Sequence, residues 1–276
     1  MLTDRTITVH GSHFHYTERG DPHAPAVVLL HGVTGHARTW DDEGAALASH
    51  YRVLALDQRG HGDSDPPPDA DYTIATLAAD LAAFADGLAL QRFALVALSL
   101  GGRVAIQYAA TNPGRVTQLM VIDIGPDIAS EGRMRVGRMM AGTPERFATL
   151  DDVVAYQRAN NPRSSEALLR ARVEHGVRPV PGGGFTWKYD RGLRELVRGG
   201  RWSDPLDLWP AWRALACPTL VVRGAESDIL TADIAKKMIL AQPHARLAEV
   251  AGAGHTVPGD QPAAFIRLLR EFLRVS

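Results

Sequence analysis

Residues 93–102 read FALVALSLGG, an apolar run that leads directly into a serine flanked by small residues. The segment Ala97-Leu98-Ser99-Leu100-Gly101 has the small-x-Ser-x-small form of a sharp strand-to-helix turn that lifts a serine hydroxyl above the end of a sheet. Small residues are needed two positions before and after Ser99 because strand and helix backbones approach closely there. Ala97 stands where glycine is usual, and the Gly101-Gly102 helix start supports the interpretation. We therefore interpret Ser99 as a candidate nucleophile at a helix N-terminus.

The rest of the chain alternates short apolar runs with helical patterns. Such runs without polar alternation are typical of parallel strands covered on both faces, and the β-α repetition predicts an α/β fold with a doubly wound, mostly parallel sheet. A hairpin around Gly11 is expected to add antiparallel strands at one edge. The predicted buried strands are Ala26–Leu30, Arg52–Leu56, Phe93–Leu98, Gln118–Ile122 and Thr219–Val222, and the predicted helices include Thr76–Gly87, Gly102–Ala110 and Pro262–Arg274.

The alternation stops after Ile122, and no strand-like buried run follows until Pro218. Helical patterns cover Phe147–Ala159, Ser165–Val173 and Arg191–Val197, with a glycine-rich loop between the last two. We expect a core formed by residues 1–126 and 206–276, with a helical cap inserted at residues 127–205.

The chain has 276 residues, 45% of them hydrophobic and 22% charged, which is ordinary for a globular protein. Thirty Lys and Arg balance 31 Asp and Glu, so no net positive charge favours nucleic acid or an anionic membrane as partner. The absence of a leader-like or membrane-spanning apolar run predicts a cytoplasmic protein. One cysteine, Cys217, excludes an internal disulfide.

The stretch Leu29-Leu30-His31-Gly32-Val33 ends another buried run with a His-Gly pair. A loop in this position can turn a backbone N–H toward the serine. The N–H groups of Val33 and Leu100 are therefore the predicted oxyanion donors, whereas the His31 side chain is expected to be structural.

Residues 57–64 read DQRGHGDS, and a glycine-rich loop containing His255 follows the strand-like segment 246–250. Together with His31-Gly32, Ser99 and the carboxylates after the later strands, these motifs resemble the α/β-hydrolase fold family over essentially the whole chain. The resemblance implies an eight-stranded sheet with a capping insertion, and it implies that the 57–64 turn is structural. Relatives that open epoxides or displace halides carry Asp at the nucleophile position, so Ser99 implies acyl transfer.

A serine nucleophile needs a base, and an imidazole base needs a carboxylate to fix its tautomer. The chain order Ser99, Asp228, His255 is the order of an α/β-hydrolase triad. Asp228 is the predicted acid, and Asp123 and Glu226 are the alternatives, because Asp123 also ends a strand and Glu226 lies two residues from Asp228.

These features predict a cofactor-free and metal-free serine hydrolase that acts on small to medium carboxylic esters or lactones. Hydrolytic C–C cleavage of a diketone, amide hydrolysis, and ligand binding without turnover remain alternatives. The Met and aromatic content of the insertion predicts an apolar pocket, with Met139, Met140, Trp187 and Val257 as candidate lining residues. The sequence predicts no oligomeric state.

Overall fold

The computed structural model of the protein describes residues 1–200 and 206–275. Its centre is one eight-stranded sheet of order β1-β2-β4-β3-β5-β6-β9-β10, in which β2 runs antiparallel to both of its neighbours, β1 and β4, and the other neighbouring strands run parallel. The predicted fold class is confirmed. The strands are β1 (Thr3–Val9), β2 (Ser12–Arg19), β3 (Ala26–Leu30), β4 (Arg52–Leu56), β5 (Phe93–Leu98), β6 (Val116–Ile122), β9 (Thr219–Gly224) and β10 (Ala245–Val250).

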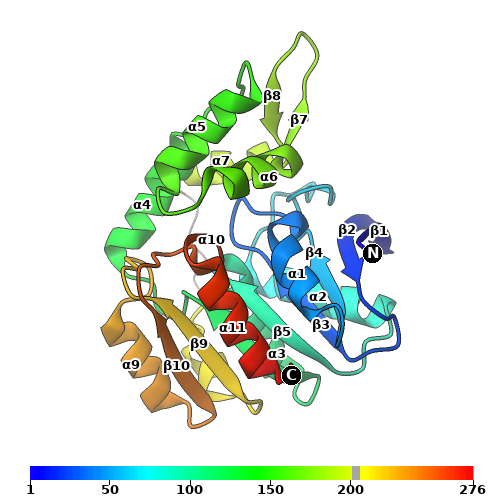
Figure 1. Ribbon diagram of the computed structural model, residues 1–276, viewed down its shortest axis with the longest axis vertical. Helices are drawn as coiled ribbons and strands as arrows, with labels where there is room; N and C mark the ends of the chain where they lie inside the picture. Colours follow the sequence, from blue (N-terminus) through cyan, green and yellow to red (C-terminus); the bar gives the residue numbers. More distant parts are fainter. Residues whose placement is uncertain (201–205, 276) are drawn as a thin grey trace.

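Helices cover both faces of this sheet (Figure 1). One face packs against the 3-10 turn η1 (Ala37–Trp40) and the helices α1 (Asp41–Leu47) and α11 (Pro262–Leu273). The other face packs against α2 (Ile74–Gly87), α3 (Leu100–Thr111), α8 (Trp209–Arg213) and α9 (Ala232–Ala241). A short helix, α10 (Val257–Asp260), precedes α11.

The central strands contribute side chains to both layers. In β3, Val28 and Leu30 belong to the core on the α2–α3 side, whereas Val27 and Leu29 belong to the core on the α1–α11 side. All four are fully buried. This two-sided burial is why these strands read as continuous apolar runs instead of alternating ones.

The part of the chain between β6 and β9 that spans residues 130–198 forms a separate layer beyond one end of the sheet (Figure 1). It has its own apolar cluster, which includes Val153, Leu169, Val173 and Trp187. Its elements are α4 (Ser130–Ala141), α5 (Leu150–Asn160), α6 (Glu166–Gly176), β7 (Val177–Pro179), β8 (Phe185–Trp187) and α7 (Arg191–Arg198).

The sequence predicts a purely helical insertion, but the structure contains two short strands there. Strands β7 and β8 pair antiparallel around the predicted glycine-rich loop. Three residues per strand are too few to show a strand pattern in sequence, and Phe147 bridges to Phe185 beside them. The predicted end of the insertion, residue 205, lies outside the described residues.

Among the described residues, no helix is long and apolar enough to cross a bilayer.

Candidate active site

Ser99 occupies the turn between β5 and α3. Its backbone has φ 53° and ψ −115°, a conformation that non-glycine residues adopt only under strain. Its N–H continues the sheet ladder by donating to the carbonyl of Ile122 at 3.1 Å, and α3 begins at the next residue. The strained turn thus presents the Ser99 hydroxyl between the end of the sheet and a helix N-terminus.

Close packing around this turn explains the small residues in the sequence. A Cβ on Gly101 would lie 2.7 Å from the carbonyl oxygen of His31, and one on Gly102 would lie 2.4 Å from Ile124 Cγ2. Ala97 is fully buried in the core, where its methyl group is accommodated. The glycines after the serine are therefore steric requirements of the turn.

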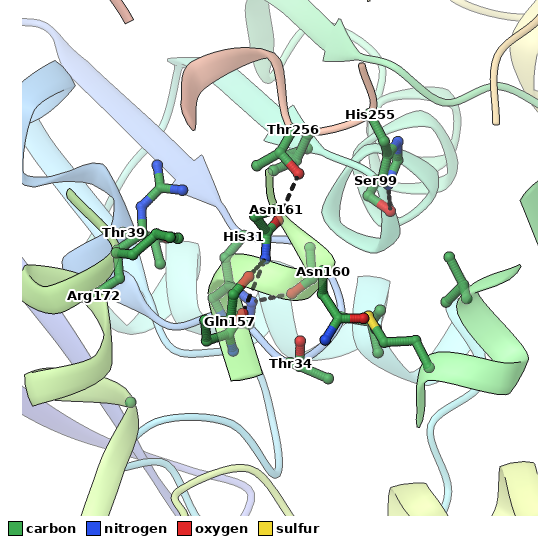
Figure 2. A pocket seen from close by; sticks show the side chains of 18 of the residues that line it. His31, Thr34, Thr39, Ser99, Gln157, Asn160, Asn161, Arg172, His255 and Thr256 are labelled. Carbon is green, nitrogen blue, oxygen red and sulfur yellow. Dashed lines mark hydrogen bonds between the residues drawn. The ribbon is translucent and has the colours of Figure 1, made fainter. Parts of the chain in front are cut away.

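His255 lies in the loop after β10 and faces Ser99 (Figure 2). Its Nε2 is 2.9 Å from Ser99 Oγ, and its Nδ1 is 2.8 Å from Asp123 Oδ2. The structure thus brings together the predicted serine and histidine, and it supplies a carboxylate on the other ring nitrogen. With Nδ1–H donating to the carboxylate, the Nε2 lone pair is directed at the serine hydroxyl.

The carboxylate at His255 belongs to Asp123, the first residue after β6, and not to Asp228 as predicted. Asp123 is fully buried and has φ 50°, a left-handed conformation that aspartate tolerates better than most residues. Its Oδ1 accepts the Gly224 N–H at 3.0 Å, and its Oδ2 accepts the Ser227 hydroxyl besides the His255 ring. These donors replace water around the buried charge.

Asp228 is instead held by the insertion. Arg135 of α4 binds its carboxylate with both ends of the guanidinium, Nε to Oδ2 at 2.5 Å and Nη2 to Oδ1 at 2.8 Å. This neighbour keeps the pKa of Asp228 below its usual value. The third candidate, Glu226, pairs with Arg163, whose Nε lies 3.0 Å from Glu226 Oε2. Asp228 and Glu226 therefore both link the core to the insertion.

The two predicted oxyanion donors flank Ser99. Leu100 is the first residue of α3, where N–H groups have no partner within the helix. Val33 follows Gly32, which packs so closely that a Cβ on it would lie 3.2 Å from Ser99 Cβ. Within residues 1–200 and 206–275, neither N–H donates to another protein group. Their role as oxyanion donors stays a prediction.

His31 and the 57–64 turn hold these loops in place. The His31 ring donates a hydrogen bond through Nδ1 to the Gly32 carbonyl oxygen at 2.8 Å and accepts one through Nε2 from the Gln58 N–H at 3.1 Å. Burial lowers the pKa of His31 to about 3, so the ring is neutral. Asp57 accepts N–H groups from Ala37 and Asp63. His31 is therefore structural, as expected.

A cavity of about 800 Å³ lies above Ser99 and His255, between the loops of the core and the insertion. Of the predicted lining residues, Met139 and Trp187 line it. Met140 and Val257 do not, because Met140 is buried in the core of the insertion and Val257 in the core under α11. A second cavity of about 260 Å³ also reaches Ser99 and is lined mainly by aliphatic side chains such as Ile124, Val136 and Ile229.

The larger cavity is more polar than predicted. Figure 2 shows Gln157, Asn160 and Asn161 of the insertion between Ser99 on one side and Arg172 on the other. Asn161 joins the network by hydrogen bonding to Gln157 at 3.0 Å. Sequence reasoning missed these residues. A signal existed for Arg172, which falls on the apolar face of its helix between Leu169 and Val173.

In the described part of the chain, one group of side chains has the spacing of metal ligands: His15, Asp57 and Asp63. Their polar atoms are already engaged, since His15 Nδ1 lies 2.7 Å from Asp57 and Lys188 lies 2.6 Å from Asp63. None of the three lines the cavity at Ser99.

The fold and this site define a known class of protein. Residues 25–262 match the family model of the alpha/beta hydrolase fold, and the chain belongs to that family. A 2-(acetamidomethylene)succinate hydrolase from Mesorhizobium japonicum is 29% identical over 249 residues, which cover 90% of this chain and 88% of the relative. An esterase from Mycobacterium tuberculosis is 31% identical over 258 residues, covering 91% and 83%. The crystal structure of an E-2-(acetamidomethylene)succinate hydrolase superposes with a TM-score of 0.91 at 28% identity, and the match covers 100% of both chains.

Proposed function

We propose that the protein is a serine hydrolase that forms an acyl-enzyme on Ser99. The observation that carries this proposal is the hydrogen-bonded series Ser99, His255 and Asp123 at the floor of a cavity. A serine hydroxyl is a weak nucleophile, and a base oriented by a buried carboxylate is the arrangement that activates it.

In the proposed reaction, His255 Nε2 removes the proton of the Ser99 hydroxyl as Oγ attacks the substrate carbonyl carbon. The N–H groups of Val33 and Leu100 stabilise the negative oxygen that forms. His255 then gives the proton to the departing alkoxide, which leaves as the alcohol. Water, deprotonated by His255, hydrolyses the acyl-enzyme and restores Ser99. Asp123 holds the ring and stabilises its charged form throughout.

The substrate we propose is a small to medium carboxylic ester or lactone. The insertion lies over Ser99 as a cap and limits the substrate to what a cavity of about 800 Å³ admits. The esterase among the relatives supports ester hydrolysis. No residue of this mechanism requires a cofactor.

The experiment that tests the proposal is active-site labelling with a fluorophosphonate, followed by peptide mapping. We expect one label per chain on Ser99, none in Ser99→Ala, and full labelling of the control Ser130→Ala, an exposed serine at the start of α4. Short-chain 4-nitrophenyl esters should be hydrolysed by the wild type and by the control alone.

A substrate panel separates the bond types. Esters of increasing acyl length, lactones, an anilide and a vinylogous diketone are compared by kcat/KM. An optimum at short to medium esters or at lactones supports the proposal. A diketone or anilide with a higher kcat/KM than every ester would show that the protein cleaves a C–C or amide bond instead. An unlabelled Ser99 in folded protein would refute the serine mechanism.

A further inference from the structure

Arg172 places a cation in the wall of the larger cavity. It lies on α6, on the same face as Leu169 and Val173, both of which are buried in the insertion's apolar cluster. Figure 2 shows Arg172 beside Thr39, on the opposite side of the view from Ser99 and His255. An arginine on the buried face of a helix is costly unless its charge is compensated.

The Arg172 guanidinium lacks the partner that the neighbouring arginines have. Arg135 and Arg163 each bind a carboxylate of the core. Among the described residues, Arg172 forms no ion pair within 4.0 Å, and its Nε is buried without a hydrogen-bond acceptor. Its burial lowers its pKa from the usual value.

The carboxyl group that most strongly offsets the charge of Arg172 does so only in part. Glu43 of α1 interacts with Arg172 at longer range, but burial raises the pKa of Glu43 to about 7. Near neutral pH this carboxyl is therefore only partly ionised. Asp42 and Asp260 also act on Arg172 at a distance, without contacting it. The site retains capacity for one more negative group.

Other residues that line this cavity also carry buried polar atoms without partners. Trp40 Nε1 and His36 Nδ1 are two such atoms among the described residues, and both side chains line the cavity. His36 Nε2 lies 2.9 Å from the Arg172 carbonyl oxygen and must donate to it. The tryptophan N–H is a donor, whereas His36 Nδ1 is an acceptor, because burial lowers the pKa of His36 to about 4 and keeps the ring neutral.

The Arg172 guanidinium packs against Gly259 of α10. A Cβ there would approach Arg172 Nη1 to 2.6 Å and Ser164 Oγ to 3.0 Å, and the Ser164 hydroxyl is likewise buried without a partner. Arg172 Nη1 and the Ser164 hydroxyl therefore both pack against Gly259, which leaves no room for a side chain there, and neither Ser164 nor Gly259 lines the cavity. Carboxylate oxygens accept several hydrogen bonds and match the planar fork of an arginine.

We propose that Arg172 recognises a free carboxylate on the substrate, at the end of the cavity remote from Ser99. The inference rests on the proposed function and narrows its substrate class: an ester or lactone whose acyl or alcohol part carries a second, anionic group. The aliphatic side cavity at Ser99 would take the uncharged part of the substrate.

Equilibrium binding tests the carboxylate site without requiring turnover. Monomethyl esters of succinate, glutarate and adipate are titrated calorimetrically into Ser99→Ala, with the dimethyl esters as uncharged counterparts. We expect at least one monomethyl ester to bind 10-fold or more tightly than its dimethyl counterpart. Adding Arg172→Gln should abolish that difference, whereas Arg172→Lys should retain part of it because the charge remains.

The matched control is Arg170→Gln on the same helix, where the arginine is solvent-exposed and pairs with Asp151. It should leave the preference for the monoanion unchanged. A preference that survives Arg172→Gln, or that is lost equally in Arg170→Gln, would overturn the proposal, as would equal binding of charged and uncharged esters.

Turnover supplies an independent comparison. Mono-4-nitrophenyl glutarate and 4-nitrophenyl valerate differ only by a carboxylate in place of a methyl group. Arg172→Gln should raise KM for the glutarate ester 10- to 100-fold and change the valerate ester less than 3-fold. An equal loss on both esters would assign Arg172 a structural role. If the wild type hydrolyses neither ester and Ser99 is not labelled, the proposed function fails, while the calorimetric result still decides the carboxylate site.

Discussion

The two carboxylates near His255 make opposite predictions that one pair of variants can separate. Asp123→Asn places an amide where the carboxylate oxygen now accepts from His255 Nδ1 at 2.8 Å. Because the Gly224 N–H already donates to Asp123 Oδ1, the amide oxygen is expected to take that position and the NH₂ group to face the ring. A donor at Nδ1 moves the ring proton to Nε2, where it removes the lone pair that should accept from Ser99.

The expected loss in kcat is about 10³- to 10⁴-fold, or about 4–5.5 kcal/mol of transition-state stabilisation. Asp228→Asn breaks the ion pair with Arg135, whose side chain is 40% exposed, with Asp228 at 31%. Pairs with this degree of exposure contribute about 0–1 kcal/mol. Asp228→Asn should therefore change kcat by less than about 10-fold.

Both variants are assayed with 4-nitrophenyl butyrate under saturating and single-turnover conditions. Circular dichroism and the Tm establish that each remains folded. A large loss of kcat in Asp228→Asn together with near-normal turnover by Asp123→Asn would refute the assignment of the acid. Comparable large losses in both folded variants would show that the insertion's anchor also positions the reacting groups.

Two further predictions concern stability. Gly101→Ala forces a Cβ to within 2.7 Å of the His31 carbonyl oxygen, so it should lower the free energy of unfolding measured in urea by about 1–3 kcal/mol. Gly137→Ala in α4 meets open space and should raise the free energy of unfolding by about 0.5–1 kcal/mol. Equal effects of the two variants would contradict the steric argument. Glu43 has a pKa of about 7 in the folded protein against 4.5 in the unfolded chain, so the folded state binds the proton more tightly. The free energy of unfolding of the wild type should therefore fall by about 3 kcal/mol relative to Glu43→Gln as the pH rises from about 4 to 8. Parallel pH profiles of unfolding for the two proteins would refute that prediction.

Most of the sheet was predictable because each central strand is buried on both faces. The run Ala26–Leu30 is apolar throughout for that reason, and its predicted bounds coincide with β3. The position of Ser99 was equally predictable, because the turn requires small residues at fixed positions around it. His255 followed from its glycine-rich loop after the last strand.

The acid was not predictable from order along the chain, because Asp123 and Asp228 both follow buried strands that are neighbours in the sheet. The backbone conformation decides which one faces His255, and the left-handed φ of Asp123 is not encoded as a spacing. The cavity-lining residues could not be predicted from the sequence either, because side-chain direction depends on packing. Met139 and Met140 are adjacent on α4, yet packing directs one to the cavity and buries the other.

The position of Asp123 has a consequence for how this protein can change over evolution. The acid ends the strand that precedes the insertion, and the loop after β9 holds the insertion through Asp228 and Arg135. In the proposed mechanism, proton transfer depends on Asp123, whereas the ion pairs that hold the insertion use Asp228 and Glu226. The contacts that hold an insertion of another shape or charge can therefore change without a change at Asp123, so substrate range can diverge while the proposed reaction chemistry stays constant.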